Sequence, residues 1–300
     1  MQNKIITMLR LQDEMNLIVN PNWKTAGYKW FRAVMVEGVE GLEHHGYKWW
    51  KKQECDMAQL RMELIDIFHF AISKAIEDGA GKSEEMVAEE IALYFKDDLM
   101  DIVFFGEVFD RDQPLIEDLD LMVGMAAFGY FSFGLFSNIM NKTGLTFDEL
   151  FKTYVSKNVL NRFRQKNGYK TGEYVKDWSA LKLEKSVVEG RALEDNDHLH
   201  DLMKIVPSDK EGENYAQRLE FLLQLRYVDV CKANRKFIAK ELTDTALGNS
   251  YCGSALYAVK DFPELSGDEI ACVLRYINGS QKGIDHVTLH DIAIKVSRSL

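Results

Sequence analysis

The sequence predicts an all-α fold on three observations. Apolar residues recur every three to four positions along most of the chain, whereas the alternation expected of strands is scarce. Only four prolines occur, at positions 21, 114, 207 and 263, so long helices can run between them. With 46% hydrophobic residues, the chain has enough apolar material to bury a sizeable core.

The expected helices follow one another along the whole chain. The periodicity places them at about residues 3–19, 29–52, 57–78, 84–106, 116–141, 147–167, 183–204, 213–246, 267–279 and 287–298. Two of them should begin with a capping box, in which a hydroxyl and a carboxylate bind each other's free amides, at Thr146–Glu149 and Ser266–Glu269. Gly79 and Gly144 suit helix ends, where glycine adopts a left-handed conformation easily.

One stretch, from Leu121 to Asn141, carries no charged residue. It is long enough to cross a bilayer as a helix. Its flanks are acidic before it and nearly neutral after it, without a cluster of positive charge. We therefore expect a helix buried in a helical core or a dimer interface, with a membrane span as the alternative.

The turn-rich stretch Asn167–Gly172 and the more polar sequence after Trp178 suggest two domains. We place the boundary near residue 180, which gives a domain at 1–180 and a helical C-terminal extension at 181–300. The acidic motifs of the first half have no counterpart in the second, so no internal repeat is evident.

Charge and cysteine content restrict the class of protein. A net charge of −10 argues against a nucleic-acid-binding surface, although a metal can still recruit a small anion to an acidic pocket. The four cysteines lack zinc-type spacing, and the N-terminus lacks the apolar core of a signal peptide. We expect free thiols and a cytoplasmic protein, in a bacterium or in the host cytoplasm if a virus encodes it.

Two pairs of carboxylates form the first candidate site. Glu37 and Glu40, and likewise Glu63 and Asp66, are three residues apart, which puts each pair on one helical face. A short loop joins the two helices, so they should pack as antiparallel neighbours and bring four carboxylates together. Such an all-oxygen cluster, with no obvious lysine or arginine among it, suits Mg²⁺ or Mn²⁺. The alternative is two ordinary solvated helix faces.

Asp66 lies within the apolar run Leu64–Ile72. A buried carboxylate there should be paired or bound to a metal, because burial of an unpaired charge is costly. Arg61 is the main alternative partner for Glu63 or Asp66.

Gly38 and Gly41 lie inside the first of these two helices. Each destabilises a helix by about 1 kcal/mol relative to alanine. Their presence suggests close approach by another segment or a ligand, or else a loosened helix.

A second candidate site combines cations and amides. Lys157, Asn161 and Arg164 share one helical face, and Tyr169 and Lys176 follow on a glycine-containing loop. Such donors suit a polyphosphate, although a solvated basic helix end is the alternative. Together with a carboxylate-bound metal they indicate a nucleoside triphosphate site. Neither a P-loop nor a GxGxxG motif is present.

Three blocks of the sequence resemble the main motifs of the dimeric all-α dUTPases, within the all-α nucleoside triphosphate pyrophosphatase superfamily. They are Glu37–Lys51, Arg61–Phe70 and Lys157–Trp178. The N-terminal LQDEMN and the Asn22-Trp23 pair also fit. The resemblance implies a helical bundle of that type, a homodimer, and Mg²⁺-dependent hydrolysis of dUTP, and often dUDP, to dUMP.

The resemblance also implies a role for individual residues. The metal ligands would be Glu37, Glu40, Glu63 and Asp66, with Glu37 orienting and deprotonating the attacking water and Glu40 as the alternative. The phosphates would be held by Lys157, Asn161, Arg164, Tyr169 and Lys176. The base and sugar would be contacted by Gln12, Asn16, Trp49, His69, Phe70 and Asn158. Core packing is the alternative for the aromatic residues and His69.

Two departures from the family leave alternatives open. Asp13 stands where a second glutamine often follows the first, and a carboxylate there could alter base choice. The same chemistry on dCTP or another dNTP is therefore one alternative, and a nucleotide-binding regulator with weak hydrolysis is another. The resemblance does not cover residues 179–300, to which we assign no function.

Overall fold

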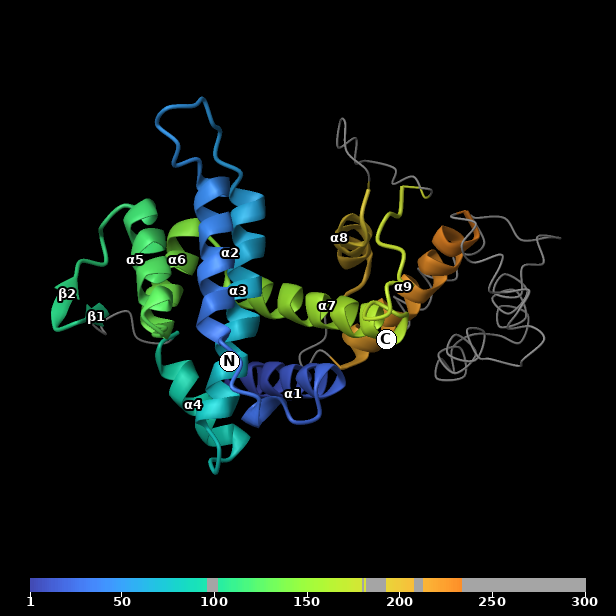
Figure 1. Ribbon diagram of the computed structural model, residues 1–300, viewed down its shortest axis with the longest axis horizontal. Helices are drawn as coiled ribbons and strands as arrows, with labels where there is room; N and C mark the ends of the chain where they lie inside the picture. The colour runs from blue at the N-terminus through green and yellow to red at the C-terminus, as the bar shows by residue number, and fades with distance from the viewer. Residues whose placement is uncertain (96–101, 180, 182–192, 208–212, 234–300) are drawn as a thin grey trace. The chain divides into compact units, whose positions relative to one another are not determined.

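The computed structural model describes residues 1–95, 102–179, 181, 193–207 and 213–233 (Figure 1). The elements within these ranges are α1 (Gln2–Val19), η1 (Trp23–Thr25), α2 (Trp30–His45), α3 (Met57–Asp78), α4 (Glu84–Leu93), β1 (Ile102–Phe104), β2 (Glu107–Phe109), α5 (Leu115–Ala127), α6 (Phe133–Thr143), α7 (Phe147–Lys166), α8 (Asp195–Ile205) and α9 (Glu213–Ala233).

The predicted all-α fold is confirmed, since the described strands are only the short antiparallel hairpin β1–β2. Helices α1, α3 and α7 match their predicted ranges within a residue. Helix α2 ends earlier than predicted because Gly46 adopts a left-handed φ of 87° after His45. The hairpin replaces the predicted end of the fourth helix. The helices expected at 267–279 and 287–298, and the box at Ser266, lie outside the described residues.

The uncharged stretch from Leu121 to Asn141 forms two helices, so the prediction of one helix there was wrong. Gly129 adopts a left-handed φ of 79° and interrupts the helical conformation between α5 and α6. Ser132 caps α6, since its Oγ accepts a hydrogen bond from Leu135 N (3.2 Å). Within the described residues no helix is both long and apolar enough to span a membrane.

Two compact units make up the chain, Met1–Asn158 and Val159–Leu300. This division falls within α7, whereas the sequence suggested a boundary near residue 180, which stays a prediction. Within the first unit, α2 packs along α3 and α5 packs along α2 (Figure 1). The core centres on Phe68 of α3, which stacks on Phe136 (5.2 Å) and meets Tyr154 edge-to-face (5.8 Å). The predicted capping box at Thr146–Glu149 begins α7.

The second unit has its own aromatic core. Phe163 from the end of α7 packs edge-to-face on Tyr227 of α9 (5.3 Å), and Trp178 lies tilted against the same ring (5.6 Å). Trp178 and Leu199 of α8 are fully buried. The buried core of this unit therefore includes residues of α8 and α9, which follow Trp178 in the sequence.

Gly38 explains the close packing of α2 against α5. A Cβ added at Gly38 would lie 2.7 Å from Val123 Cγ2, whereas one at Gly41 would make an ordinary contact with Glu63 Cβ at 4.0 Å. The close approach suggested by the sequence is therefore present at Gly38, and it comes from another helix of the chain.

The effect of Gly38→Ala should reverse sign with the residue at position 123. In the wild type we expect a loss of about 1–2 kcal/mol, since overpacking outweighs the gain of about 1 kcal/mol in helix propensity. In a Val123→Ala background the same change should stabilise the protein. Urea unfolding of the four proteins tests this, and equal effects in both backgrounds would contradict the close contact.

Candidate active site

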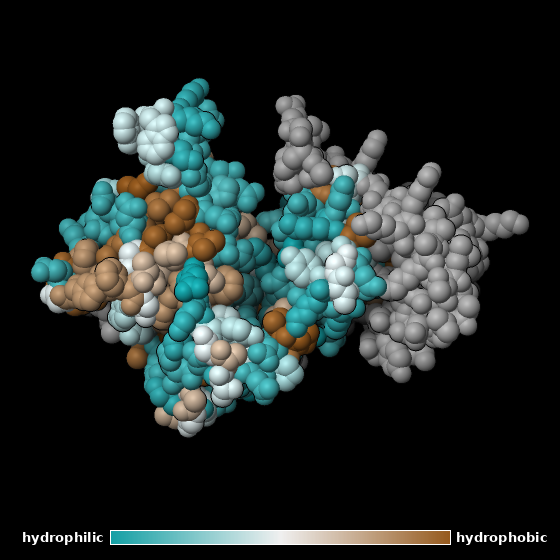
Figure 2. Space-filling view, in the orientation of Figure 1, coloured by the Kyte–Doolittle hydropathy of each residue, from teal (hydrophilic) through white to brown (hydrophobic). Residues whose placement is uncertain are grey.

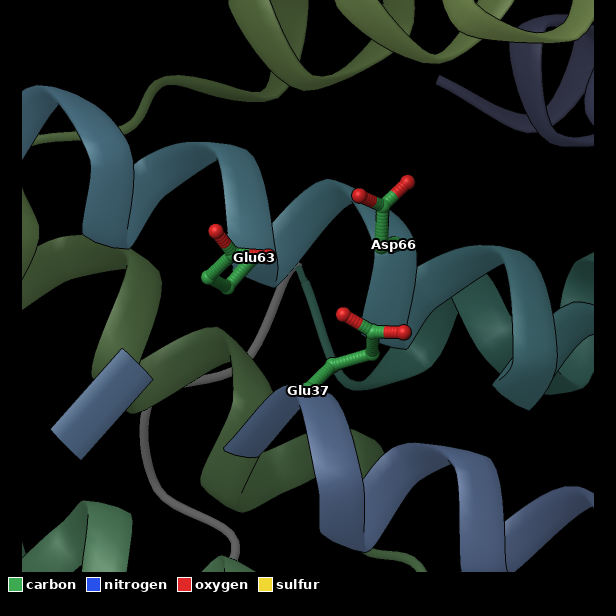
Figure 3. A group of neighbouring side chains, drawn as sticks. All are labelled: Glu37, Glu63 and Asp66. Carbon is green, nitrogen blue, oxygen red and sulfur yellow. The ribbon is translucent and has the colours of Figure 1, made fainter. Parts of the chain in front are cut away.

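Three predicted metal ligands meet between α2 and α3. Glu37 extends from α2 toward α3, where Glu63 and Asp66 lie one turn apart (Figure 3). One carboxylate oxygen from each lies within 4.8 Å of the others. Glu40, the fourth predicted ligand, is exposed and stands outside this group. The spacing of three residues therefore brought together three of the four carboxylates.

Burial and the neighbouring carboxylates raise the pKa of two of these carboxyls. Burial, followed by the charges of Asp66, Glu40 and Glu63, raises the pKa of Glu37 to about 7. Burial and then Asp66 raise that of Glu63 to about 7 as well, against the opposing effect of Lys157. Glu37 also hydrogen-bonds Glu63. The protein alone therefore does not balance the negative charge held here.

Lys157 of α7 forms an ion pair with Asp66, and His44 Nε2 lies 3.3 Å from Glu63 Oε1. The sequence shows no obvious lysine or arginine among the four carboxylates, whereas the fold brings Lys157 of α7 to the cluster. Arg61 is not the partner of either carboxylate, because its guanidinium donates to the backbone oxygen of Thr143. Asp66 is also less buried than its apolar neighbours suggested, with 24% of its side chain exposed.

The cluster fits a hard divalent cation. It offers only carboxylate oxygens, which are the ligands that Mg²⁺ and Mn²⁺ prefer. The raised pKa values show that the ionised forms are held at a disadvantage, which a bound cation would remove. Glu37, Glu63 and Asp66 are therefore the residues that could hold a metal.

A buried hydrogen-bond network joins α1, α3 and α7. Gln12 Oε1 accepts from Tyr154 Oη and from His69 Nδ1, both at 2.8 Å. Gln12 Nε2 donates to Asn16 Oδ1 (3.1 Å), and Asn16 Nδ2 donates to Ser73 Oγ (3.0 Å). Three of the predicted base and sugar contacts are therefore linked to one another.

The network fixes the protonation of His69. Because Gln12 Oε1 is an acceptor, Nδ1 carries the proton and Nε2 is a bare acceptor. Burial, and then Lys157, lower the pKa of His69 to about 3, so the ring is neutral near pH 7. Its Nε2 and the Oδ1 of Asn158 are buried without a hydrogen-bond partner among the described residues. Asn158 Nδ2 donates to Leu11 O (3.0 Å).

The other predicted base contacts are not part of this network. Trp49 is 90% exposed on the loop after α2, where it meets Trp50 edge-to-face (5.5 Å). This loop lies at the end of the α2–α3 pair far from α1 (Figure 1). Phe70 follows His69 on α3 and is partly buried. This conformation therefore does not bring Trp49 to Gln12, and its role stays a prediction.

Asp13 on α1 forms hydrogen bonds with the nearby η1 segment. Its carboxylate accepts from Trp23 Nε1 (2.9 Å) and from Lys24 Nζ (2.8 Å). Both partners belong to η1, so this carboxylate serves to fasten η1 to α1. The Asn22-Trp23 pair noted in the sequence thus has a structural partner.

The remaining predicted phosphate contacts belong to the second unit. Arg164 forms a two-point ion pair with Asp195, and its Nη1 donates to Asn161 Oδ1 (3.1 Å). Lys176 pairs with Glu194 at 3.0 Å, and Tyr169 is 48% exposed. The two cations are therefore paired with acidic residues that the sequence did not mark as partners.

Sequence reasoning missed the supporting residues. His44 follows Glu40 by four residues on α2, a helical spacing that could have drawn attention to it. Tyr154 carries no such signal, because its link to Gln12 joins residues 142 positions apart. Asp195 likewise carries no such signal, because it lies 31 positions from Arg164 and only tertiary packing brings the two together.

A protein whose described residues are mostly helical and whose carboxylates gather from two adjacent helices has the features of a metal-dependent hydrolase. A model of the dUTPase family matches residues 4–169, more than half of the chain. The chain therefore belongs to the all-α dUTPase family, whose enzymes hydrolyse dUTP and generally use a divalent metal. The match includes the carboxylates, the buried network and Arg164. No curated protein matches the chain.

Removal of one clustered carboxylate should stabilise the metal-free protein. The native state holds extra protons on Glu37 and Glu63 between pH 4.5 and about 7, so stability should fall as pH rises through this range. Glu63→Gln should flatten this fall and add about 1–2 kcal/mol at pH 7.5, after allowance for solvent screening.

Urea unfolding in EDTA at pH 5 and pH 7.5 measures this effect, and Glu54→Gln in the exposed α2–α3 loop is the control. Addition of Mg²⁺ should raise the unfolding midpoint of the wild type more than that of Glu63→Gln. A Glu63→Gln protein that is less stable than the wild type at pH 7.5 in EDTA would contradict the repulsion.

Proposed function

We propose that this protein is a Mg²⁺-dependent dUTP diphosphatase that converts dUTP to dUMP and pyrophosphate, and accepts dUDP. Such an enzyme limits uracil incorporation into DNA and supplies dUMP. The observation that carries the proposal is the convergence of Glu37, Glu63 and Asp66 within a chain of this family. Glu40 completes the ligand set in this proposal, since its charge already acts on both glutamates of the cluster.

Glu37 orients the attacking water and takes its proton. In the metal-free protein its pKa is raised to about 7, and a cation bound beside it would lower that pKa, so that the ionised carboxylate could accept a proton near neutral pH. Glu40 is the alternative base, one turn further along α2. Mg²⁺ held by these carboxylates would neutralise phosphate charge and lower the pKa of a bound water.

Five residues hold the phosphate chain in this proposal. Lys157 lies beside Asp66, where a phosphate bound near the carboxylates would meet its ammonium group. The others are Asn161, Arg164, Tyr169 and Lys176, all of which follow along the third motif block. Arginine suits this role because its fork binds two phosphate oxygens at once.

The bare acceptors favour uracil over cytosine. Uracil carries a hydrogen on N3, whereas N3 of cytosine is an acceptor. His69 Nε2 and Asn158 Oδ1 are buried acceptors that lack donors within the described residues. A ligand with a donor would satisfy one of them, while an acceptor placed there would repel it. Asn16, Phe70 and Trp49 complete the proposed base and sugar contacts.

Two rival functions make different demands on the same residues. The same hydrolysis of dCTP requires a donor at the base site, which the neutral His69 does not provide at Nε2. A nucleotide-binding regulator does not need a water-activating cluster, and the presence of three close carboxylates therefore favours the enzyme.

We also propose that the protein is a homodimer. Phe105, Val108 and Phe128 are 73%, 65% and 71% exposed, and Phe105 meets Phe128 edge-to-face (5.1 Å). Figure 2 shows apolar residues gathered over the β1–β2 hairpin and α5. An exposed apolar surface of this kind is typical of a face covered by another protein. Sedimentation of the purified protein would distinguish a dimer from a monomer.

Hydrolysis of a nucleotide panel tests the activity. With Mg²⁺ the wild type should release pyrophosphate from dUTP faster than from dCTP, dTTP or UTP, and EDTA should stop the reaction. Asp66→Ala should lower kcat/KM by about 100-fold or more, since it removes a metal ligand. Asp78→Ala, an exposed site on the same helix, should retain the wild-type rate. Absent or equal hydrolysis across the panel would refute the proposal.

Base preference should depend on Gln12 and not on Asp13. Gln12→Ala releases His69 from its fixed tautomer, so the ratio of kcat/KM for dUTP over dCTP should fall about tenfold. Asp13→Ala should change this ratio less than twofold, because Asp13 binds η1. A ratio is independent of the folded fraction. The reverse outcome would make Asp13 the residue that selects the base.

A further inference from the structure

Arg164 is held by a residue that lies beyond the segment matched by the family. Its Nε donates to Asp195 Oδ2 and its Nη2 to Asp195 Oδ1, both at 2.8 Å. Asp195 is completely buried, and only 15% of the Arg164 side chain is exposed. A two-point pair of this kind fixes the plane of the guanidinium as well as its position.

Asp195 itself is fixed from several sides. It begins α8, where the free amides and the dipole of a helix favour a negative charge. Tyr174 Oη donates to its Oδ2 (2.8 Å), and the Asp195 backbone N–H donates to Lys176 O (3.3 Å). Burial, and then the charge of Asp195, raise the pKa of Tyr174, so this hydroxyl keeps its proton. The carboxylate is thus an immobile acceptor of three hydrogen bonds.

The contact leaves part of the guanidinium available. Arginine has five N–H donors, of which two bind Asp195 and one binds Asn161. Among the described residues, the other two donors have no partner, so they could bind another anion. An arginine supported on one edge by a buried carboxylate is arranged to present its other donors in a fixed direction.

The neighbouring pair of Lys176 and Glu194 differs in kind. It is a single contact of 3.0 Å, and the two side chains are 50% and 41% exposed. Such a surface pair is weak and can separate when a stronger anion arrives. Asp195 cannot separate from Arg164 in this way, because it is buried and its carboxylate accepts three hydrogen bonds. A carboxylate that competes with phosphate for a cation should be exposed and weakly bound, as Glu194 is. Asp195 is buried and doubly bonded to the guanidinium, as expected of a residue that orients Arg164.

We propose that Asp195 is a positioning residue that holds the guanidinium of Arg164 for the phosphate chain of the nucleotide. This inference rests on the proposed function, in which Arg164 binds phosphate. It gives the sequence beyond the family match a part in the site, since Asp195 lies outside residues 4–169. Pyrophosphate and nucleoside triphosphates are the ligands whose affinity should depend on it.

The test compares the full-length wild type with Asp195→Asn in the presence of Mg²⁺. The KM for dUTP and the inhibition constant of pyrophosphate should both rise about tenfold, as expected when a charge-assisted support is lost, while kcat changes less. Asp201→Asn is the matched control, because Asp201 lies on α8 as Asp195 does and forms its own ion pair, with Arg226 of α9 (2.6 Å). It should leave both constants within twofold of the wild type.

Two further variants separate positioning from a defect in folding. Tyr174→Phe removes one donor from Asp195 with little change of shape, and it should raise the pyrophosphate constant in the same direction by a smaller factor. In an Arg164→Ala background, Asp195→Asn should change that constant less than twofold, because the group it supports is absent.

Each outcome bears on a different statement. A wild type that does not hydrolyse dUTP refutes the proposed function, whatever the variants do. An active wild type with unchanged constants in Asp195→Asn and Tyr174→Phe overturns the role of Asp195 alone. Tighter pyrophosphate binding by Asp195→Asn would also overturn it, since Asp195 would then compete with phosphate. Additive losses in the Arg164→Ala background would indicate a merely structural role.

Discussion

The carboxylates of Glu37, Glu63 and Asp66 repel one another, and the packing of α2 on α3 holds them together against that repulsion. The contact of Gly38 with Val123 and the aromatic cluster around Phe68 belong to the same unit and supply packing that opposes it. The cluster therefore lowers the stability of the metal-free protein, and a bound cation would restore it. Such a loss of stability at a functional site is common. The metal-free protein keeps part of the charge neutral by holding protons on two glutamates.

Helix α3 couples this cluster to the buried polar network. Glu63, Asp66 and His69 follow one another at steps of three residues, so the register of one helix sets the spacing between carboxylates and imidazole. His69 is held from α1 by Gln12, which also accepts from Tyr154 of α7. The stacking of His69 on Tyr154 at 3.8 Å further restricts the ring. A shift of α3 would therefore disturb both groups at once.

The sequence was sufficient for the helical class and for the grouping of three carboxylates, because both depend on local periodicity. It predicted α3 to the residue, yet it joined α5 and α6 into one helix, since the turn at Gly129 carries no charge to interrupt an apolar stretch. The partners Lys157–Asp66 and Arg164–Asp195 could not be predicted, because such contacts depend on tertiary packing rather than on spacing. For the same reason the sequence did not predict that the exposed Glu40 lies outside the group of three.

Lys157 and Arg164, two of the cations proposed to bind phosphate, are held by their acidic partners in different ways. Lys157 forms an ion pair with Asp66, which is a proposed metal ligand. A bound metal would therefore compete with Lys157 for this carboxylate. Arg164 pairs with Asp195, which is buried and is not one of the proposed metal ligands. A lysine is a point charge on a flexible stem and can turn from one anion to another, whereas the planar guanidinium gains most from a fixed support. The flexible lysine is thus paired with the proposed metal ligand Asp66, and the planar arginine with the buried Asp195.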